Sequence, residues 1–152
     1  MKHLIPSLLT VLMVIACSES LQEQAALLAE QAATLCEEGQ LDKARILIDS
    51  LRRTYPDIVE ARKAALRLHQ DVELKATQEE LKQTDSLLIL ANRELEALQK
   101  QVDAHKASLT ATADELTLLT RTRIRRDSIR TSYETLGAKI RYIRKRQKEA
   151  TD

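Results

Sequence analysis

A ladder of apolar residues at seven-residue spacing is the most regular feature of the chain. The ladder begins at Leu74, and no Gly or Pro interrupts it as far as Leu116. Its members are Leu74, Leu81, Leu88, Leu95, Val102, Leu109 and Leu116. A strict seven-residue repeat keeps one stripe of a helix against a partner helix, which is typical of coiled coils. We therefore expect a long coiled-coil helix over residues 57–120.

A second stripe lies three residues after each ladder position and is more polar. It reads Thr77, Thr84, Ala91, Leu98, His105, Thr112 and Leu119. Leu95 and Leu98 form the first layer in which both stripes carry Leu, so we expect the tightest packing there. We assign the coiled-coil seam to nine residues: Leu74, Leu81, Leu88, Leu95, Leu98, Val102, Leu109, Leu116 and Leu119. This seam predicts a homo-oligomer, and on its polar side His105 is expected to set the register rather than bind a ligand.

The apolar pattern changes register after Leu119. A fresh stripe with alternating spacings of four and three comprises Ile129, Tyr133, Leu136, Ile140 and Ile143. The segment before it is rich in Thr, which lowers helix propensity. Such a change indicates either a bent but continuous helix or a chain that folds back near residues 110–126. The first alternative is favoured here.

Residues 17–56 are predicted to form a helical hairpin. Ser20 and Glu23 have the spacing of a capping box, which predicts that the first helix begins there. Gly39 should end that helix, and Asp42 can cap the next one. Pro56 should end the second helix, because the residue before proline avoids the helical conformation.

The same segment resembles a tetratricopeptide repeat. The resemblance is carried by the stretch from Glu38 to Ala44, by Ala32 in the first helix, and by the later apolar positions and Pro56. It covers one unit, whereas about three stacked units are normally needed for stability. The resemblance therefore implies a packed helical hairpin and not a complete peptide-binding groove.

Composition supports an all-α protein in which this hairpin is followed by the long coiled-coil helix. The chain has no Trp and no Phe, only two glycines and two prolines, and 31% charged residues. Aromatic side chains supply the largest units of buried area, so a wide globular core is not expected. Many charges and few helix breakers are typical of elongated helical proteins.

Residues 1–16 have the form of a secretory signal: a basic start followed by an apolar run that is too short to span a bilayer, which needs about 20 apolar residues. Val14-Ile15-Ala16-Cys17 resembles the bacterial lipoprotein signal. That resemblance implies lipidation of Cys17, which would become the mature N-terminus. It also implies a location in the bacterial cell envelope, and Ser18 after the cysteine resembles an outer-membrane address. An ordinary secretory signal with a chance cysteine is the alternative.

Charge is unevenly distributed along the chain. Residues 121–148 hold eleven Lys or Arg against two acidic residues, about +9, whereas residues 18–120 carry about −7. Residues 121–152 are therefore interpreted as a basic helical tip. Its expected contacts with an anionic envelope polymer, lipid or protein are Arg141, Arg144, Lys145, Arg146 and Lys148. A solvated helix end is the alternative, and nucleic acid does not fit the expected compartment.

No residue pattern predicts catalysis. His69 and His105 stand far apart, neither has the spacing of a metal ligand, and no Gly-rich phosphate loop is present. We expect no enzyme activity, cofactor or metal. The function expected from the sequence is that of a lipid-anchored structural or interaction protein, acting as a scaffold, spacer or adaptor. The alternative is a periplasmic holdase, because basic coiled-coil arms are similar to the helical tentacles of such chaperones.

Overall fold

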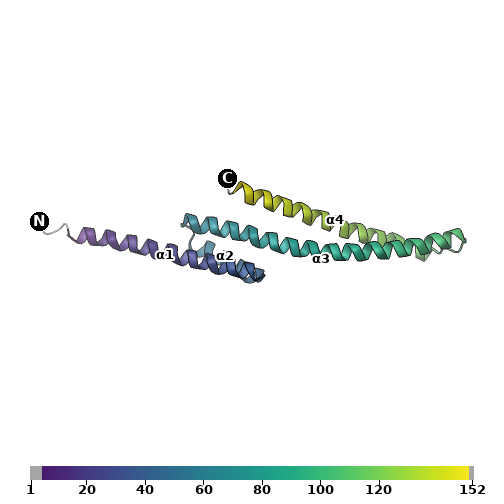
Figure 1. Ribbon diagram of the computed structural model, residues 1–152, viewed down its shortest axis with the longest axis horizontal. Helices are drawn as coiled ribbons and strands as arrows, with labels where there is room; N and C mark the ends of the chain where they lie inside the picture. The colour runs from purple at the N-terminus through teal and green to yellow at the C-terminus, as the bar shows by residue number, and fades with distance from the viewer. Residues whose placement is uncertain (1–4, 151–152) are drawn as a thin grey trace. The chain divides into compact units, whose positions relative to one another are not determined.

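A computed structural model describes the backbone of residues 5–150 and the side chains of residues 21–150. Four helices follow one another: α1 (Ile5–Glu37), α2 (Leu41–Thr54), α3 (Val59–Ala107) and α4 (Ala113–Glu149) (Figure 1). Within the described backbone no residue lies in a strand. The all-α fold, with a helical hairpin followed by a long helix, is therefore confirmed.

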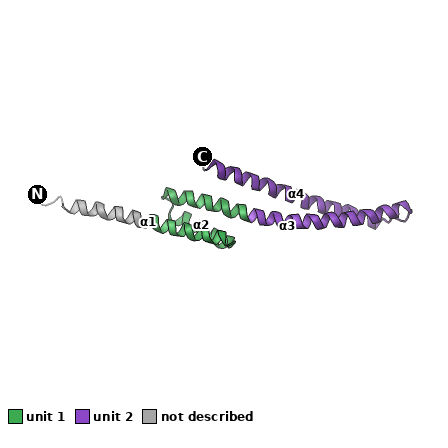
Figure 2. Ribbon diagram, viewed as in Figure 1, with its two compact units in different colours: residues 1–75 green, residues 76–152 purple. Residues whose placement is uncertain are grey.

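The chain divides into two compact units within α3 (Figure 2). Unit 1 comprises residues 1–75, and unit 2 comprises residues 76–152. The first part of α3 thus packs with α1 and α2, and the rest of it belongs with α4.

Unit 1 is built around a core of small side chains. The buried residues are Ala25, Ala32, Cys36, Ala44, Ile48, Leu51, Ala61, Ala65 and Val72. Because alanines dominate, helix axes can approach closely without large side chains between them. Polar contacts support the packing: the Tyr55 hydroxyl donates to Gln24 (3.2 Å), and the Lys75 ammonium donates to the Cys36 carbonyl (2.9 Å). The predicted hairpin is present, and α3 adds a third helix to it.

The link between α1 and α2 depends on Gly39, as predicted. Gly39 has φ +77°, a left-handed conformation that glycine adopts without a side-chain clash. Its amide donates to the Cys36 carbonyl (3.2 Å), and the Gln40 amide donates to the Leu35 carbonyl (2.8 Å). This pair of bonds is a Schellman motif, which satisfies carbonyls at the end of a helix.

Two predicted helix starts in unit 1 were wrong. Helix α1 already begins at Ile5, so Ser20 lies inside it and does not begin it. Helix α2 has Gln40 at its N-cap with no side-chain cap bond, and Asp42 lies in its first turn. There an acidic side chain favours the helix dipole, and Asp42 accepts from Arg45 at 2.9 Å.

Unit 2 is an antiparallel pair of helices, so the favoured continuous helix is wrong. Helix α3 ends at Ala107 and α4 begins at Ala113, after which the chain runs back along α3. Polar contacts join the two helices. Arg125 lies 3.2 Å from Glu94, and Arg123 donates to Gln99 at 3.0 Å. The predicted boundary at residue 120 therefore differs from the observed break at residues 108–112.

A second Schellman motif ends α3, but its left-handed residue is Leu109. The Leu109 amide donates to the Lys106 carbonyl (3.1 Å), and the Thr110 amide donates to the His105 carbonyl (2.8 Å). Leu109 has φ +61° and is 94% exposed. The left-handed conformation costs a residue with a side chain roughly 1–2 kcal/mol. The neighbouring bonds therefore hold Leu109 in a strained conformation.

A capping box starts α4 directly after this turn. The Thr112 hydroxyl accepts from the Glu115 amide (3.3 Å), and the Glu115 carboxylate accepts from the Thr112 amide (3.0 Å). This reciprocal pair satisfies two amides that the helix itself leaves without partners. The turn therefore closes α3 and opens α4 within five residues, 108–112.

The two stripes recognised in the sequence meet inside this hairpin. The α3 seam is buried or half-buried from Thr77 to His105, and so is the fresh α4 stripe. If the register of the two contacts above continues along both helices, small α3 residues fall near large α4 residues: Ala91 near Ile129, Thr84 near Leu136, and Thr77 near Ile143. This size complementarity explains why the second α3 stripe has so few large apolar residues.

Two predicted seam residues lie outside the seam. Leu109 is in the turn, and Leu116 is 41% exposed on α4. Leu119 is buried, but it belongs to the seam of α4 rather than to a continuation of the α3 ladder. The ladder spacing continued past Val102 by coincidence, because the helix that would have carried it ends at Ala107.

The left-handed conformation of Leu109 predicts that glycine at this position stabilises the protein. Leu109→Gly should raise the free energy of unfolding by about 0.5–1 kcal/mol, because relief of backbone strain exceeds the greater freedom of glycine in the unfolded chain. Urea unfolding followed by circular dichroism measures this change. The control is Ala97→Gly at an exposed position inside α3, which should lower stability by about 0.5–1 kcal/mol. Equal destabilisation by both substitutions would contradict the proposed strain.

Candidate functional site

The basic segment predicted from the sequence forms most of α4 and falls into two parts. In the first part, most cations contact neighbouring polar groups. Besides Arg123 and Arg125, Arg130 donates to Glu134 at 2.9 Å. Since their partners lie on both helices, these cations serve the hairpin itself.

Arg126 occupies a seam position of α4 and is only 25% exposed. Its Nε atom is buried and makes no hydrogen bond, although Asp127 Oδ1 lies 2.9 Å away. The contact is thus an ion pair without hydrogen-bond geometry. A cation in an otherwise apolar seam lowers its stability and disfavours other registers.

The second part contains the five predicted anion contacts, Arg141, Arg144, Lys145, Arg146 and Lys148, and all five are exposed. Two of them are paired: Lys145 lies 3.8 Å and Arg146 lies 3.2 Å from Glu149. The other three make no ion pair or hydrogen bond with any residue that the structure describes. Their spacings of three and four residues place them on one face of α4.

A shallow notch of about 410 Å³ lies at the start of this open face, within unit 2. Leu81, Ile140 and Tyr133 supply its apolar surface. Glu134 and Gly137 line it as well, and Arg141 and Arg144 stand at its basic end. The sequence indicated the two arginines but gave no sign of the apolar surface beside them, because Leu81 comes from the other helix.

Gly137 is not required by the fold of α4. It lies inside the helix, where glycine costs roughly 0.5–1 kcal/mol relative to alanine. A methyl group at this position would meet only the flexible end of Arg141, with Nη1 3.6 Å away. Neither backbone conformation nor close packing within the described residues explains the glycine. Its effect is to leave the notch open down to the helix backbone.

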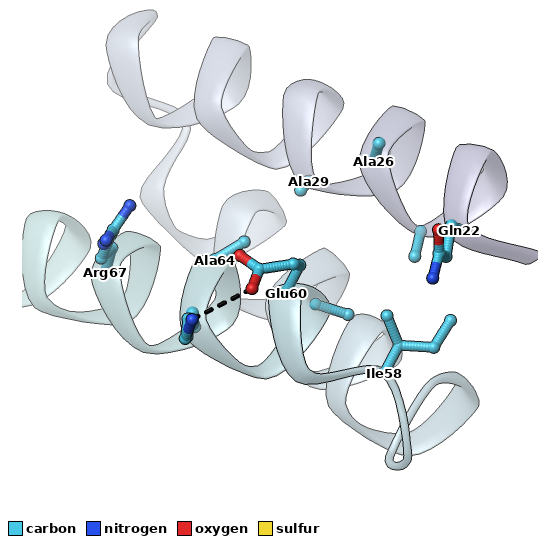
Figure 3. Close-up of a pocket in the computed structure, with 10 residues that line it drawn as sticks. Gln22, Ala26, Ala29, Ile58, Glu60, Ala64 and Arg67 are labelled. Atoms are coloured by element: carbon cyan, nitrogen blue, oxygen red, sulfur yellow. Dashed lines mark hydrogen bonds and ion pairs between the residues drawn. The ribbon is translucent and has the colours of Figure 1, made fainter.

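A second recess, of about 390 Å³, lies in unit 1 between α1 and the start of α3 (Figure 3). Ala26 and Ala29 line it from α1, and Ala64 lines it from α3 (Figure 3). Glu60 and Lys63 form an ion pair at its edge (3.0 Å). The small side chains make the recess largely apolar, and the ion pair places charges at its edge.

The two cysteines lie in different parts of α1. Cys17, the predicted lipidation site, lies outside the residues whose side chains the structure describes. Cys36 is buried in unit 1, and burial raises the pKa of its thiol, while nearby Lys75 lowers it to a smaller extent. The net increase keeps Cys36 in its less reactive, protonated form.

His105 joins the two ends of the α3–α4 turn. Its Nδ1 atom lies 2.7 Å from Glu115 Oε1. The hydrogen bond from the Thr112 amide is the main cause that lowers the pKa of the Glu115 carboxyl, and His105 adds to the effect. His105 thus makes a polar contact between α3 and α4 beside the turn.

No group of three or more His, Cys, Asp or Glu side chains suited to a metal ion occurs within the described part of the chain. In the same part, no helix has both the length and the apolar character needed to cross a membrane. No protein-family model, curated protein or solved structure matches this sequence.

The lowered pKa of Glu115 predicts a pH-dependent contribution to stability. A carboxylate whose pKa falls on folding stabilises the folded state above its unfolded pKa, about 4.5, and loses that effect as pH falls through the lower folded value. Glu115→Gln should therefore lower the melting temperature at pH 7. The difference from the parent should shrink progressively below pH 4.5.

Thermal unfolding between pH 3 and pH 7 measures this effect. Glu79→Gln is the matched control, because Glu79 is exposed in the same unit and makes no hydrogen bond or ion pair with the described residues. A constant difference between Glu115→Gln and the parent across this range would contradict the role assigned to the carboxylate charge.

Proposed function

We propose that the protein is a lipid-anchored component of the bacterial cell envelope that acts by binding, as a scaffold, spacer or adaptor. The signal-like residues 1–16 and Cys17 support the anchor. The exposed cations Arg141, Arg144, Lys145, Arg146 and Lys148 of α4, which we call the basic face, support the binding role. An anionic polymer, lipid or protein of the envelope is the proposed partner, and no catalytic step is part of this function.

The proposal rests on the exposure of Arg141, Arg144 and Lys148 and on their lack of polar partners. They are exposed and make no ion pair or hydrogen bond with the described residues, on a helix where most other cations have polar partners. Like charges three or four residues apart on a helix repel one another. An anionic surface would relieve this repulsion and gain charge-assisted hydrogen bonds from the arginines.

Exposed leucines support a second candidate function, that of a periplasmic holdase. Leu87 and Leu90 on α3 are 53% and 59% exposed, outside the seam that α4 covers. An unfolded client could bind such apolar side chains. Suppression of client aggregation by the purified protein at stoichiometric ratio would favour this function, and its loss in a Leu87→Ser/Leu90→Ser variant would assign it to these residues.

Self-association is a further proposal that now needs a different surface. The α3 seam that was expected to meet another chain is covered by α4 of the same chain between residues 77 and 105. A dimer would therefore use exposed positions such as Leu87 and Leu90, or exchange α4 between two copies. The second arrangement would keep every seam contact while changing which chain supplies it.

The anchor is tested by Cys17→Ala. If Cys17 is acylated, this substitution should block maturation and leave residues 1–16 attached, because the lipoprotein pathway that the motif resembles requires the cysteine. Metabolic labelling with a fatty acid and mass spectrometry of the N-terminus measure both effects. A Cys17→Ala chain that is still cut before residue 18 would indicate ordinary secretion instead.

The basic face is tested by replacing Arg141, Arg144, Lys145, Arg146 and Lys148 with Gln in a chain that starts at Ser18. Retention on isolated envelope fractions should fall at least about tenfold at low salt. The parent's own retention should fall as salt rises, because exposed charges are screened over ~8 Å at physiological ionic strength.

A matched control removes the same number of exposed cations from unit 1. It replaces Lys43, Arg52, Arg53, Arg62 and Arg67 with Gln. This variant has the same net charge as the first and should keep most of the retention. Equal retention of parent and both variants at every salt concentration would leave the basic face as a solvated helix end.

A further inference from the structure

We propose that the notch beside Gly137 binds the phosphate headgroup of an anionic phospholipid. The phosphate would lie between Arg141 and Arg144, and the first carbons of the lipid would lie on Leu81 and Ile140. This inference rests on the proposed function and assigns a chemical class to its anionic partner. Its basis is the combination of apolar surface, open backbone and two unpaired guanidinium groups at one place in unit 2.

The two arginines determine the charged end of the ligand. Arg141 and Arg144 are three residues apart and therefore lie on the same side of α4, at the edge of the notch. Guanidinium groups present several N–H donors in a fixed plane, an arrangement that suits the oxygen atoms of a phosphate. Neither group has a partner among the described residues, so no internal contact has to break before an anion binds.

Gly137 determines how close the ligand can come. The absent side chain opens the notch to the helix backbone, and the only atom near a methyl group placed there would be Arg141 Nη1 at 3.6 Å. A ligand in the notch would occupy this space beside the same guanidinium. The glycine, which the fold does not require, is then explained by the ligand.

The surroundings favour a lipid headgroup over an acidic peptide. Leu81, Ile140 and Tyr133 give the ligand an apolar surface next to its charge, as a phospholipid requires. Glu134 also lines the notch, and it precedes Arg144 by ten residues, about 15 Å along the axis of α4. A chain of acidic residues along this face would meet that carboxylate, whereas a single phosphate group would not extend that far.

The test follows the methyl groups of Ile140 by nuclear magnetic resonance, with the full-length chain held in uncharged maltoside micelles. Ile48, buried in unit 1, serves as the internal reference. The Ile140 signals should shift saturably on titration with dihexanoyl phosphatidylglycerol, while the Ile48 signals stay in place. Zwitterionic dihexanoyl phosphatidylcholine should bind at least about fivefold more weakly than phosphatidylglycerol does.

Three variants separate binding from folding. Arg141→Gln/Arg144→Gln should weaken phosphatidylglycerol binding at least about tenfold, whereas Arg121→Gln, an exposed and unpaired cation outside the notch, should leave it within about twofold. Gly137→Ala should weaken binding at least about fivefold and yet raise the melting temperature, because alanine is the better helix former. A merely structural role for Gly137 would not combine these two effects.

Several outcomes would overturn the proposal. Equal shifts with both lipids, or unchanged binding in the double Gln variant, would exclude the notch as the site. If glycerol phosphate binds as tightly as the lipid, the ligand of the notch is a water-soluble phosphate compound and not a lipid. Tighter binding of a Glu-rich helical peptide would assign the notch to a protein partner.

Failure of this inference is distinguishable from failure of the proposed function. If the Gly137→Ala variant binds phosphatidylglycerol as tightly as the parent does, while the five-Gln variant still loses envelope retention, only the proposed lipid site in the notch is overturned. Unchanged retention of the five-Gln variant would instead overturn the proposed function.

Discussion

The turn at residues 108–112 is the constraint on which unit 2 depends. The Schellman motif around Leu109 ends α3, and the capping box of Thr112 and Glu115 begins α4. Together they satisfy the backbone groups that two helix ends would otherwise leave without partners. Because the turn is short, it fixes both the direction of α4 and its register along α3. As a result, the apolar seam of α3 packs against α4 of the same chain.

The register of this hairpin divides the cations of α4 into two sets. Arg123 and Arg125 fall beside Gln99 and Glu94, where they support the pairing of the helices. The cations from residue 141 onward fall where fewer partners are within reach. One run of basic residues therefore contains a structural part and an open part. The open part is where a binding function is proposed, and its charge remains available to an external anion.

The two glycines and Leu109 show how differently backbone requirements are met in one chain. Gly39 occupies a left-handed position that glycine suits, and Leu109 occupies an equivalent position at a cost in strain. Gly137 lies in ordinary helix and leaves space beside α4 instead. Unit 1 buries mainly alanines in its core, whereas the buried residues of unit 2 are small or medium-sized on α3 and mostly larger on α4. Neither unit needs a large aromatic core.

The sequence by itself determined the all-α class, the helical hairpin with Gly39 at its turn, the seam face of α3 and the fresh stripe of α4. Periodicity reports these features because it identifies which face of a helix is buried. It does not report which helix covers that face, so only the tertiary structure showed that α4 does. A fold-back near residues 110–126 was kept as an alternative but not favoured, because Leu109 stands where glycine is expected, although Thr112 and Glu115 have the spacing of a capping box. The notch and the division between paired and open cations depend on residues from different helices, and their distances are set by packing.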